Sequence, residues 1–279
     1  MPPDWLRPDW PAPAHVRAVC TTRVGGVSAS PFDALNLGDH VGDRPADVQA
    51  NRSVLQAAIG TRPVFLKQVH GSHVAALSPA TPDGTTADAC SATAPGVACT
   101  IMVADCLPVL FTDREGTWVA AAHAGWRGLV GEGGRGVLEA VLESFQALAP
   151  IQQAQAAIKN IAPTRQAGDV LAWLGPCIGP QAFEVGAEVR AAFCDMDERA
   201  ARHFTPQQAP GKFIADLAGL ARQRLHALGV TDISGNDGTP SWCTVGNASR
   251  FFSHRRDTAR LGGSGRFAAC VWLDGALGG

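Results

Sequence analysis

The chain has no concentration of positive charge. Its 23 Lys and Arg are balanced by 25 Asp and Glu, which gives a formal net charge of −2 over 279 residues, and the longest basic run is the pair Arg255–Arg256. Proteins that bind nucleic acids or acidic membrane surfaces need clustered Lys and Arg to neutralise phosphates. We therefore expect neither nucleic acid nor membrane as a partner, and a small molecule as the substrate.

Long apolar segments are missing as well. The longest apolar run, residues 96–111, is interrupted by Asp105 and Pro108 and is shorter than the roughly 20 residues that a membrane-spanning helix needs. The first residues, MPPDWLRPDWPAPAH, have prolines where a signal peptide would need an apolar stretch. Both absences predict a cytoplasmic protein.

None of the eight cysteines lies in a CxxC pair. A chain of this length, with 46% apolar residues, can build its core without disulfides. We expect most of the cysteines to be reduced and buried as small apolar side chains. No GxGxxG motif follows a predicted strand and opens a helix, which argues against a Rossmann fold.

Short β-branched segments are interspersed with segments of helical periodicity, which predicts an α+β fold of mixed sheets and flanking helices. We expect one large domain over residues 1–279, with a Gln- and Ala-rich, loop-like insertion at 144–167. The predicted strands cover residues 16–22, 64–69, 97–103, 109–112, 118–123, 170–174 and 267–273. The predicted helices cover residues 137–148, 185–194 and 214–228.

The segment ADCLPVLFTDREGTWVAAAHAGWRG, residues 104–128, contains the most informative pattern. The turn sequence DREG lies between two apolar runs and predicts a β-hairpin. With the turn centred after Arg114, Cys106 faces His123, and directly opposed Cβ atoms lie roughly 4.5–5.5 Å apart. Both side chains could then bind one metal ion. Pro108 cannot donate a hydrogen bond in a sheet, so it predicts an edge strand or a bulge.

A third candidate ligand is His70, which ends the strand-like run VFLKQVHG. Two imidazoles and one thiolate leave a coordination position open, as in catalytic zinc sites, where zinc lowers the pKa of bound water to about 7. Each residue also has a purely structural interpretation, because cysteine after an apolar run is usually a core residue and histidine is often hydrogen-bonded in the core. The spacing alone leaves both interpretations open.

A series of motifs occurs in order along nearly the whole chain: TTRVGGVS at Thr21, FDALNLGDHVGD at Phe32, NR at Asn51, LKQVHG at Leu66, ADCLPVLF at Ala104, HAGWRG at His123, LGPCIGPQAFEVG at Leu174 and FFSHRRD at Phe251. With these motifs the sequence resembles the laccase-domain family, once described as multicopper polyphenol oxidases and now regarded as zinc-dependent purine nucleoside phosphorylases with adenosine deaminase activity. The resemblance implies that His70, Cys106 and His123 are metal ligands and catalytic residues. Two departures are FEVG, where many relatives have YEVG, and the long element ARLGGSGRF, which leaves the role of Arg266 open.

Phosphorolysis needs cations and backbone donors that hold phosphate. Arg23 in TTRVGGVS adjoins two glycines, which would suit an anion-binding loop. Arg127 follows HAGW at the predicted start of a helix, where free amides and the dipole favour anions. Gln68, two residues before His70, could reach the substrate, and Asp105 is expected to hydrogen-bond a loop rather than to act as a base. A solvated Arg23 in an ordinary glycine turn, and a surface ion pair for Arg127, are equally compatible with the sequence.

The resemblance predicts phosphorolysis of inosine, adenosine, guanosine and methylthioadenosine with zinc as the cofactor, together with adenosine deamination. The ordinary zinc-deaminase signature HxE…PCxxC is absent, so deamination would use a different framework. Copper-dependent polyphenol oxidation is one alternative, but a multicopper oxidase needs roughly ten histidines, and the chain has eight, none in HxH pairs. The other is a hydrolase of peptidoglycan precursors, an activity also linked to this family, with Cys106 as nucleophile and His123 or His70 as base.

Overall fold

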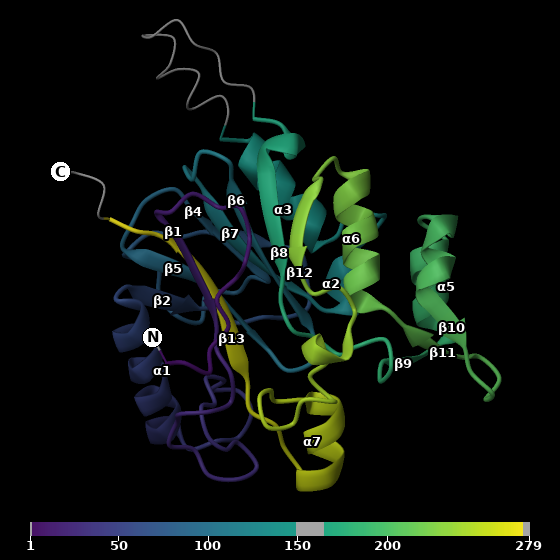
Figure 1. Ribbon diagram of the computed structural model, residues 1–279, viewed down its shortest axis with the longest axis horizontal. Helices are drawn as coiled ribbons and strands as arrows, with labels where there is room; N and C mark the ends of the chain where they lie inside the picture. Colours follow the sequence, from purple (N-terminus) through teal and green to yellow (C-terminus); the bar gives the residue numbers. More distant parts are fainter. Residues whose placement is uncertain (1, 149–164, 276–279) are drawn as a thin grey trace, which may run out of the picture.

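The computed structural model describes residues 2–148 and 165–275, whose strands form three sheets (Figure 1). In sheet order, the six-stranded sheet contains β12 (Asp232–Gly235), β8 (Val170–Leu174), β6 (Leu107–Asp113), β7 (Val119–Ala124), β4 (Ala89–Ala92) and β3 (Val74–Ala76). The four-stranded sheet contains β1 (Val16–Cys20), β13 (Phe267–Leu273), β5 (Val97–Val103) and β2 (Arg62–Phe65). The small third sheet contains β10 (Phe204–Pro206), β11 (Lys212–Ala215) and β9 (Glu184–Gly186).

Helices cover the outer faces of the two larger sheets. The α-helices in the described residues are α1 (Pro45–Ile59), α2 (Trp126–Val130), α3 (Val137–Gln146), α5 (Ala187–Cys194), α6 (Leu217–Ala227) and α7 (His254–Leu261). Short 3-10 turns lie at Ala167–Asp169, Glu198–His203 and Pro240–Trp242. None of the helices in the described part of the chain combines the length and the apolarity that crossing a bilayer requires.

The two larger sheets pack face to face, because successive side chains of a strand point to opposite faces. In β5, Ile101 and Val103 lie in the core between the sheets, whereas Met102 lies in the core on the other side. In β7, Ala121 faces the inter-sheet core and Ala122 faces away from it. Every residue of these two strands is buried, which explains their continuous apolar character.

The outer cores complete a four-layer arrangement of helix, sheet, sheet and helix (Figure 1). Leu55 of α1 packs in the same core as Met102 of β5, and Phe145 of α3 and Leu220 of α6 pack in the same core as Phe111 of β6. Burying a side chain of this size stabilises the fold by about 1.5–3 kcal/mol. The layers confirm the α+β class that the sequence predicts.

Several element boundaries differ from the predictions. The predicted strand at 64–69 ends at Phe65, and α5 and α6 begin at Ala187 and Leu217, a few residues later than predicted. Their predicted first residues, Val185 and Ile214, instead pair within the small sheet of β9 and β11. The predicted insertion at 144–167 overlaps the end of α3, which continues to Gln146, and its residues 149–164 lie outside the described residues.

The structure also contains elements that the sequence analysis did not name. They include α1 and α7 and the short strands β3, β4, β9, β10, β11 and β12, whereas α2 is the helix expected to start near Arg127. Helix α7 begins after Ser253, whose hydroxyl accepts a hydrogen bond from the Arg256 amide and so caps the helix. This cap fixes the start of a helix that borders the site described next.

Candidate metal centre

Three side chains from distant parts of the chain meet at one point. His70 lies in the loop between β2 and β3, Cys106 directly precedes β6, and His123 lies near the end of β7. Their potential ligand atoms all lie within 4.8 Å of one another. The Cys106 Sγ atom is 3.8 Å from His70 Nε2, and the centroids of the two imidazole rings are 4.7 Å apart. The structure therefore brings together the three residues that the sequence analysis selected.

The predicted hairpin is present, but its register differs by two residues. Strands β6 and β7 pair Pro108 with His123, whereas the sequence analysis paired Cys106 with His123. That pairing was wrong because the connection is longer than a tight turn: the Asp113 carboxylate accepts hydrogen bonds from backbone amides within the loop of residues 113–118 and stabilises it. A two-residue shift preserves the faces of both strands, so Cys106 still lies close to His123 although it is not opposite.

Pro108 lies in a central strand, so the prediction of an edge strand or a bulge was also wrong. Strand β6 is flanked by β7 and β8, and its pairing with β8 begins one residue later, at Val109 and Leu174. The missing amide of Pro108 therefore removes no hydrogen bond from that ladder. The Pro108 carbonyl accepts a hydrogen bond of 2.9 Å from the Gly175 amide beyond the end of β8.

A buried aspartate that the sequence analysis missed, Asp88, organises both histidines. Its carboxylate accepts hydrogen bonds from the amides of Val69, His70 and Gly71 at 2.8–3.1 Å and contacts Nδ1 of His123 at 2.9 Å. The loop needs this support because His70 has a φ of 63°, a left-handed conformation that is unusual outside glycine. A single acidic residue at the entrance of a buried strand was the available signal, since buried carboxylates need partners.

The contact with Asp88 sets the orientation of the His123 ring. With Nδ1 hydrogen-bonded to the carboxylate, Nε2 is directed toward Cys106, which is the arrangement found around histidine metal ligands. Burial by itself raises the pKa of Asp88, but hydrogen bonds from His123 and from the backbone outweigh it, and the pKa of the carboxyl is lowered. Asp88 is therefore an anion beside His123.

Cys106 and His123 shift each other's ionisation strongly. Burial raises the pKa of the Cys106 thiol, but the charges and hydrogen bonds of His123 and His70 outweigh burial and lower this pKa to about 6. Burial lowers the pKa of His123, but the Cys106 charge and the Asp88 contact raise it to about 9. At neutral pH the metal-free pair is a thiolate beside an imidazolium, and the thiolate form is the one that binds metals.

Asp105 anchors the segment that carries Cys106. Its carboxylate accepts hydrogen bonds of 2.6 Å from the Thr244 hydroxyl and from the Arg255 amide, and its own backbone has a φ of 88°. Both carboxylate oxygens are thus engaged with the loops that border the site. This agrees with the expectation that Asp105 hydrogen-bonds a loop.

The three side chains line a cavity of about 420 Å³, a size typical of small-molecule sites. Gln68 also lines it, and its amide both donates to and accepts from the backbone of Met102. The Arg127 guanidinium lies 4.4 Å from the centroid of the Trp126 ring. Further apolar lining residues include Met102, Trp126, Ile178, Phe183 and Leu217, and the basic ones are His40, Arg127, His254, Arg255 and Arg266.

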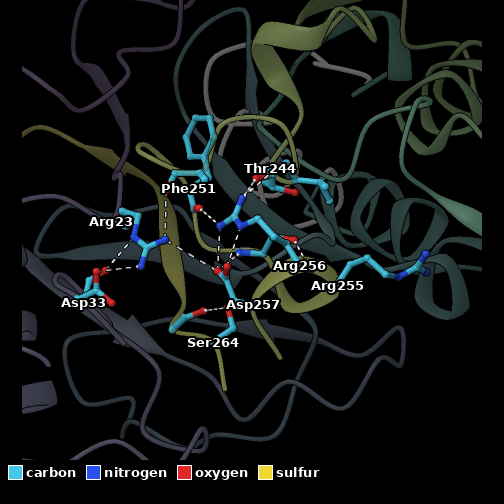
Figure 2. A network of polar contacts seen from close by, with 12 residues as sticks. Arg23, Asp33, Thr244, Phe251, Arg255, Arg256, Asp257 and Ser264 are labelled. Atoms are coloured by element: carbon cyan, nitrogen blue, oxygen red, sulfur yellow. Dashed lines mark hydrogen bonds and ion pairs between the residues drawn. The ribbon is translucent and has the colours of Figure 1, made fainter. Parts of the chain in front are cut away.

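Arg23 is not among the residues that line this cavity. Figure 2 shows its guanidinium between Asp33 and Asp257, in a network that extends to Arg256. Arg23 donates hydrogen bonds to the carbonyl oxygens of Asp33 and Ala248, and it stacks 4.7 Å from the Phe252 ring centroid. The structure thus brings Gln68 and Arg127 to the candidate ligands and directs Arg23 to intramolecular partners.

Comparison with known proteins assigns the chain to a family. The model of a family described as multi-copper polyphenol oxidoreductase laccase matches residues 17–274. The chain belongs to this family. It is 49% identical to a Pseudomonas aeruginosa protein named purine nucleoside phosphorylase over 96% of this chain and 98% of that protein. It is 45% identical to the Escherichia coli protein named purine nucleoside phosphorylase YfiH, over 95% and 97% of the two chains.

Solved structures of the family have the same fold. The Neisseria meningitidis protein NMB0706 is 42% identical and superposes with a TM-score of 0.79 over 98% of this chain and 100% of its own. The Bacillus licheniformis protein YfiH is 25% identical, with a TM-score of 0.76 over 92% of each chain. Both comparisons confirm the family resemblance and the α+β class inferred from the sequence.

Proposed function

We propose that this protein is a zinc-dependent purine nucleoside phosphorylase. The observation that carries the proposal is the convergence of His70, Cys106 and His123 in a cavity of small-molecule size. Relatives 45–49% identical over almost their whole length are named for this activity. Inosine, adenosine, guanosine and methylthioadenosine are the proposed substrates, and deamination of adenosine is a proposed second activity.

His70, Cys106 and His123 would hold the zinc ion. Two imidazoles and one thiolate are a donor set of catalytic zinc sites, which keep one position open. The contact between Asp88 and His123 Nδ1 fits this assignment, because a carboxylate commonly orients a histidine ligand in such sites. When bound, zinc would supply a Lewis acid and lower the pKa of a bound water to about 7.

The remaining cavity residues would bind and orient the nucleoside. Trp126, Phe183 and Leu217 offer apolar and aromatic surface to a purine ring. In the reaction a phosphate oxygen forms a bond to C1′ of the sugar while the bond between C1′ and the base nitrogen breaks. The electron pair of that bond leaves with the base, which takes up a proton. Gln68 and Arg127 are among the proposed polar contacts to the substrates.

Copper-dependent polyphenol oxidation, the activity in the family's name, is less well supported. Blue-copper sites also use two histidines and a cysteine, but a multicopper oxidase needs further histidine-rich centres. Within residues 2–148 and 165–275, one cluster offers three His, Cys, Asp or Glu ligands at metal-binding separation. The chain therefore lacks, in its described part, the second centre that electron transfer to oxygen would require.

The test combines metal analysis with product analysis. Purified protein is assayed for zinc and copper, and the zinc-loaded form is incubated with inosine with and without phosphate. We expect one zinc per chain and phosphate-dependent release of hypoxanthine and ribose 1-phosphate. Cys106→Ser should lose both, whereas Cys194→Ser, a change at a free thiol outside the cluster, should retain both.

Three other results would contradict the proposal in different ways. Phenol turnover by a copper-loaded protein with a strong visible absorption band would favour the oxidase. Rapid alkylation of Cys106 in a protein that is active without zinc would favour a cysteine hydrolase, because a thiol nucleophile needs no metal. Zinc-loaded protein that releases no hypoxanthine from inosine in the presence of phosphate would exclude the phosphorylase.

A further inference from the structure

One part of the cavity lining is rich in basic side chains, two of which are arginines. His40, His254, Arg255 and Arg266 contribute to it, and we call these four residues the basic wall. The acidic residue in the lining is Asp105, whose two carboxylate oxygens are already occupied by Thr244 and the Arg255 amide. Asp39, outside the lining, contacts His40 and Arg52. Neither carboxylate therefore pairs with the guanidinium of Arg266, and a cavity lined by such a group attracts anions.

Arg266 has fewer occupied donors than several other partly buried arginines; Arg222, for example, donates to carbonyl oxygens through all three guanidinium nitrogens. The guanidinium groups of Arg52, Arg224 and Arg256 each contact a carboxylate. Within residues 2–148 and 165–275, the guanidinium of Arg266 donates hydrogen bonds through one terminal nitrogen, to the carbonyl oxygens of Ser264 and Gly265. In the described part of the chain, no carboxylate lies within ion-pair distance of it. Its remaining N–H groups are available to a ligand in the cavity, because Arg266 lines it.

The backbone of Arg266 is held firmly. Its amide donates to Asn36 Oδ1 at 2.8 Å, and its carbonyl accepts from the Leu37 amide at 2.9 Å. The side-chain stem passes close to Gly38, where an added Cβ would lie 2.8 Å from Arg266 Cγ. The guanidinium is therefore placed in advance, and little conformational entropy remains to be lost when a ligand binds.

The position of Arg266 relates it directly to the candidate ligands. The next residue, Phe267, pairs with Val103 at the end of β5, and the chain then continues through Asp105 to Cys106. Burial lowers the pKa of Arg266, and the nearby charges of Cys106 and Asp105 raise it only partly toward its ordinary value. A desolvated guanidinium thus lies close to the proposed zinc site.

The other members of the basic wall have different roles. Arg255 donates to the carbonyl oxygens of Ala182 and Glu184, so its guanidinium links two rims of the cavity. His40 and His254 are exposed at the rim. Burial and then the positive charge of Arg266 lower the pKa of His40, which indicates that the two side chains are neighbours.

We propose that Arg266, with His40 and His254 beside it, forms the subsite that binds inorganic phosphate, while the purine lies against the aromatic part of the lining. This assignment rests on the proposed phosphorylase function. Guanidinium groups bind phosphate through paired, charge-assisted hydrogen bonds, which suits the free donors of Arg266. Phosphate held there supplies the oxygen that bonds to C1′ as the bond from C1′ to the base breaks.

The test separates phosphate binding from nucleoside binding. Zinc-loaded wild type, Arg266→Gln and Arg266→Lys are compared by KM for phosphate, KM for inosine and zinc content. We expect Arg266→Gln to raise the KM for phosphate by ~10–100-fold, because one charged hydrogen-bonding group is lost. The KM for inosine and the zinc content should remain close to those of the wild type, and Arg266→Lys should show an intermediate KM for phosphate.

Two control variants and a second test variant complete the experiment. Arg260→Gln removes the same charge from an exposed position of α7, and Arg23→Gln removes the arginine that the sequence alone suggested for phosphate. Neither should change the KM for phosphate. If Arg266→Gln fails to fold, His254→Gln replaces it, since this side chain is exposed, and a rise of about two- to fivefold is expected from loss of one weak contact.

Direct binding of inorganic phosphate keeps this inference separable from the proposed function. Calorimetric titration of phosphate into zinc-loaded wild type and Arg266→Gln needs no catalytic turnover. Binding to wild type that is lost in the variant supports the subsite even if no nucleoside is cleaved. Equal binding to both proteins, no binding to wild type, or an unchanged KM for phosphate in Arg266→Gln would overturn it.

Discussion

Two buried aspartates hold two networks that differ in what they leave unpaired. Asp88 accepts hydrogen bonds from the loop of His70 and contacts one nitrogen of His123, so the other imidazole nitrogen remains directed toward Cys106. Asp257 accepts from the Ser253 amide and from two nitrogens of Arg256. The first network ends in atoms that face a cavity, and the second ends within the protein.

The second network shows how an arginine motif can be structural. Beyond Asp257, Arg256 donates to the carbonyl oxygens of Thr244 and Phe251, as Figure 2 shows, and to that of Val245. Arg23 is also fully paired within the protein, with the carbonyl oxygens of Asp33 and Ala248 and the carboxylate of Asp33. The comparison teaches that burial and charge alone do not mark a functional residue. A functional residue is marked instead by a free donor or acceptor that faces the cavity.

Asp257→Ala should produce the largest change, and in stability rather than in metal binding. Removing this carboxylate leaves Arg256 and Arg23 without their buried counter-charge, which typically costs about 3–5 kcal/mol. We expect urea unfolding, followed by tryptophan fluorescence, to show a loss of this size, with the zinc affinity of the folded protein retained. Asp9→Ala, at an exposed aspartate, is the control. A loss no larger than that of the control would show that the second network contributes little to stability.

Asp88→Asn should change zinc binding, in contrast to Asp257→Ala, which should change stability. An amide at this position presents donors to backbone amides that need an acceptor, and it no longer orients His123 as an anion does. Loss of such a carboxylate typically weakens metal binding by about 10–100-fold. Zinc affinity, measured by competition with a chromophoric chelator, should fall in this range, while Asp9→Asn should bind zinc like wild type. Wild-type affinity in Asp88→Asn would mean that the histidines are positioned without the carboxylate.

Periodicity and motif content were enough to predict much of the fold. The short apolar segments of β5 and β7 and the helical spacing in α3 are local signals, and each was found close to its predicted place. The boundary between α5 and the strand before it depends on pairing with β11, a contact over a long sequence separation that propensity does not report. Local patterns therefore located most of the long core strands and α3, but they missed α1 and the short strands that only tertiary pairing creates.

The site was predictable to a similar extent. The family motifs pointed to His70, Cys106 and His123, but the hairpin register was wrong because the side chain of Asp113 stabilises a longer loop. Asp88 lies 35 residues from His123 in the sequence, and no spacing rule connects them. The sequence around Arg23 likewise suggests an anion-binding residue, whereas the structure pairs its guanidinium with groups of the protein itself.

The contact between Asp88 and His123 also predicts how zinc binding depends on pH. In the metal-free protein the pKa of Cys106 is about 6 and that of His123 is about 9. Between these values the thiol has already lost its proton, whereas the imidazole still holds one that zinc must displace. The apparent zinc affinity should therefore rise by about tenfold per pH unit in this interval and flatten above it, since fewer protons then compete. Falling pH weakens binding for the same reason, and more steeply once Cys106 is protonated.

Chelator competition at several pH values measures how steeply the zinc affinity changes with pH in the wild type and in Asp88→Asn. The pH dependence of the variant should be shallower, because it retains the Cys106 thiolate but lacks the second anion, Asp88, that keeps the proton on His123. A flat profile in the wild type would mean that His123 is already neutral before the metal arrives.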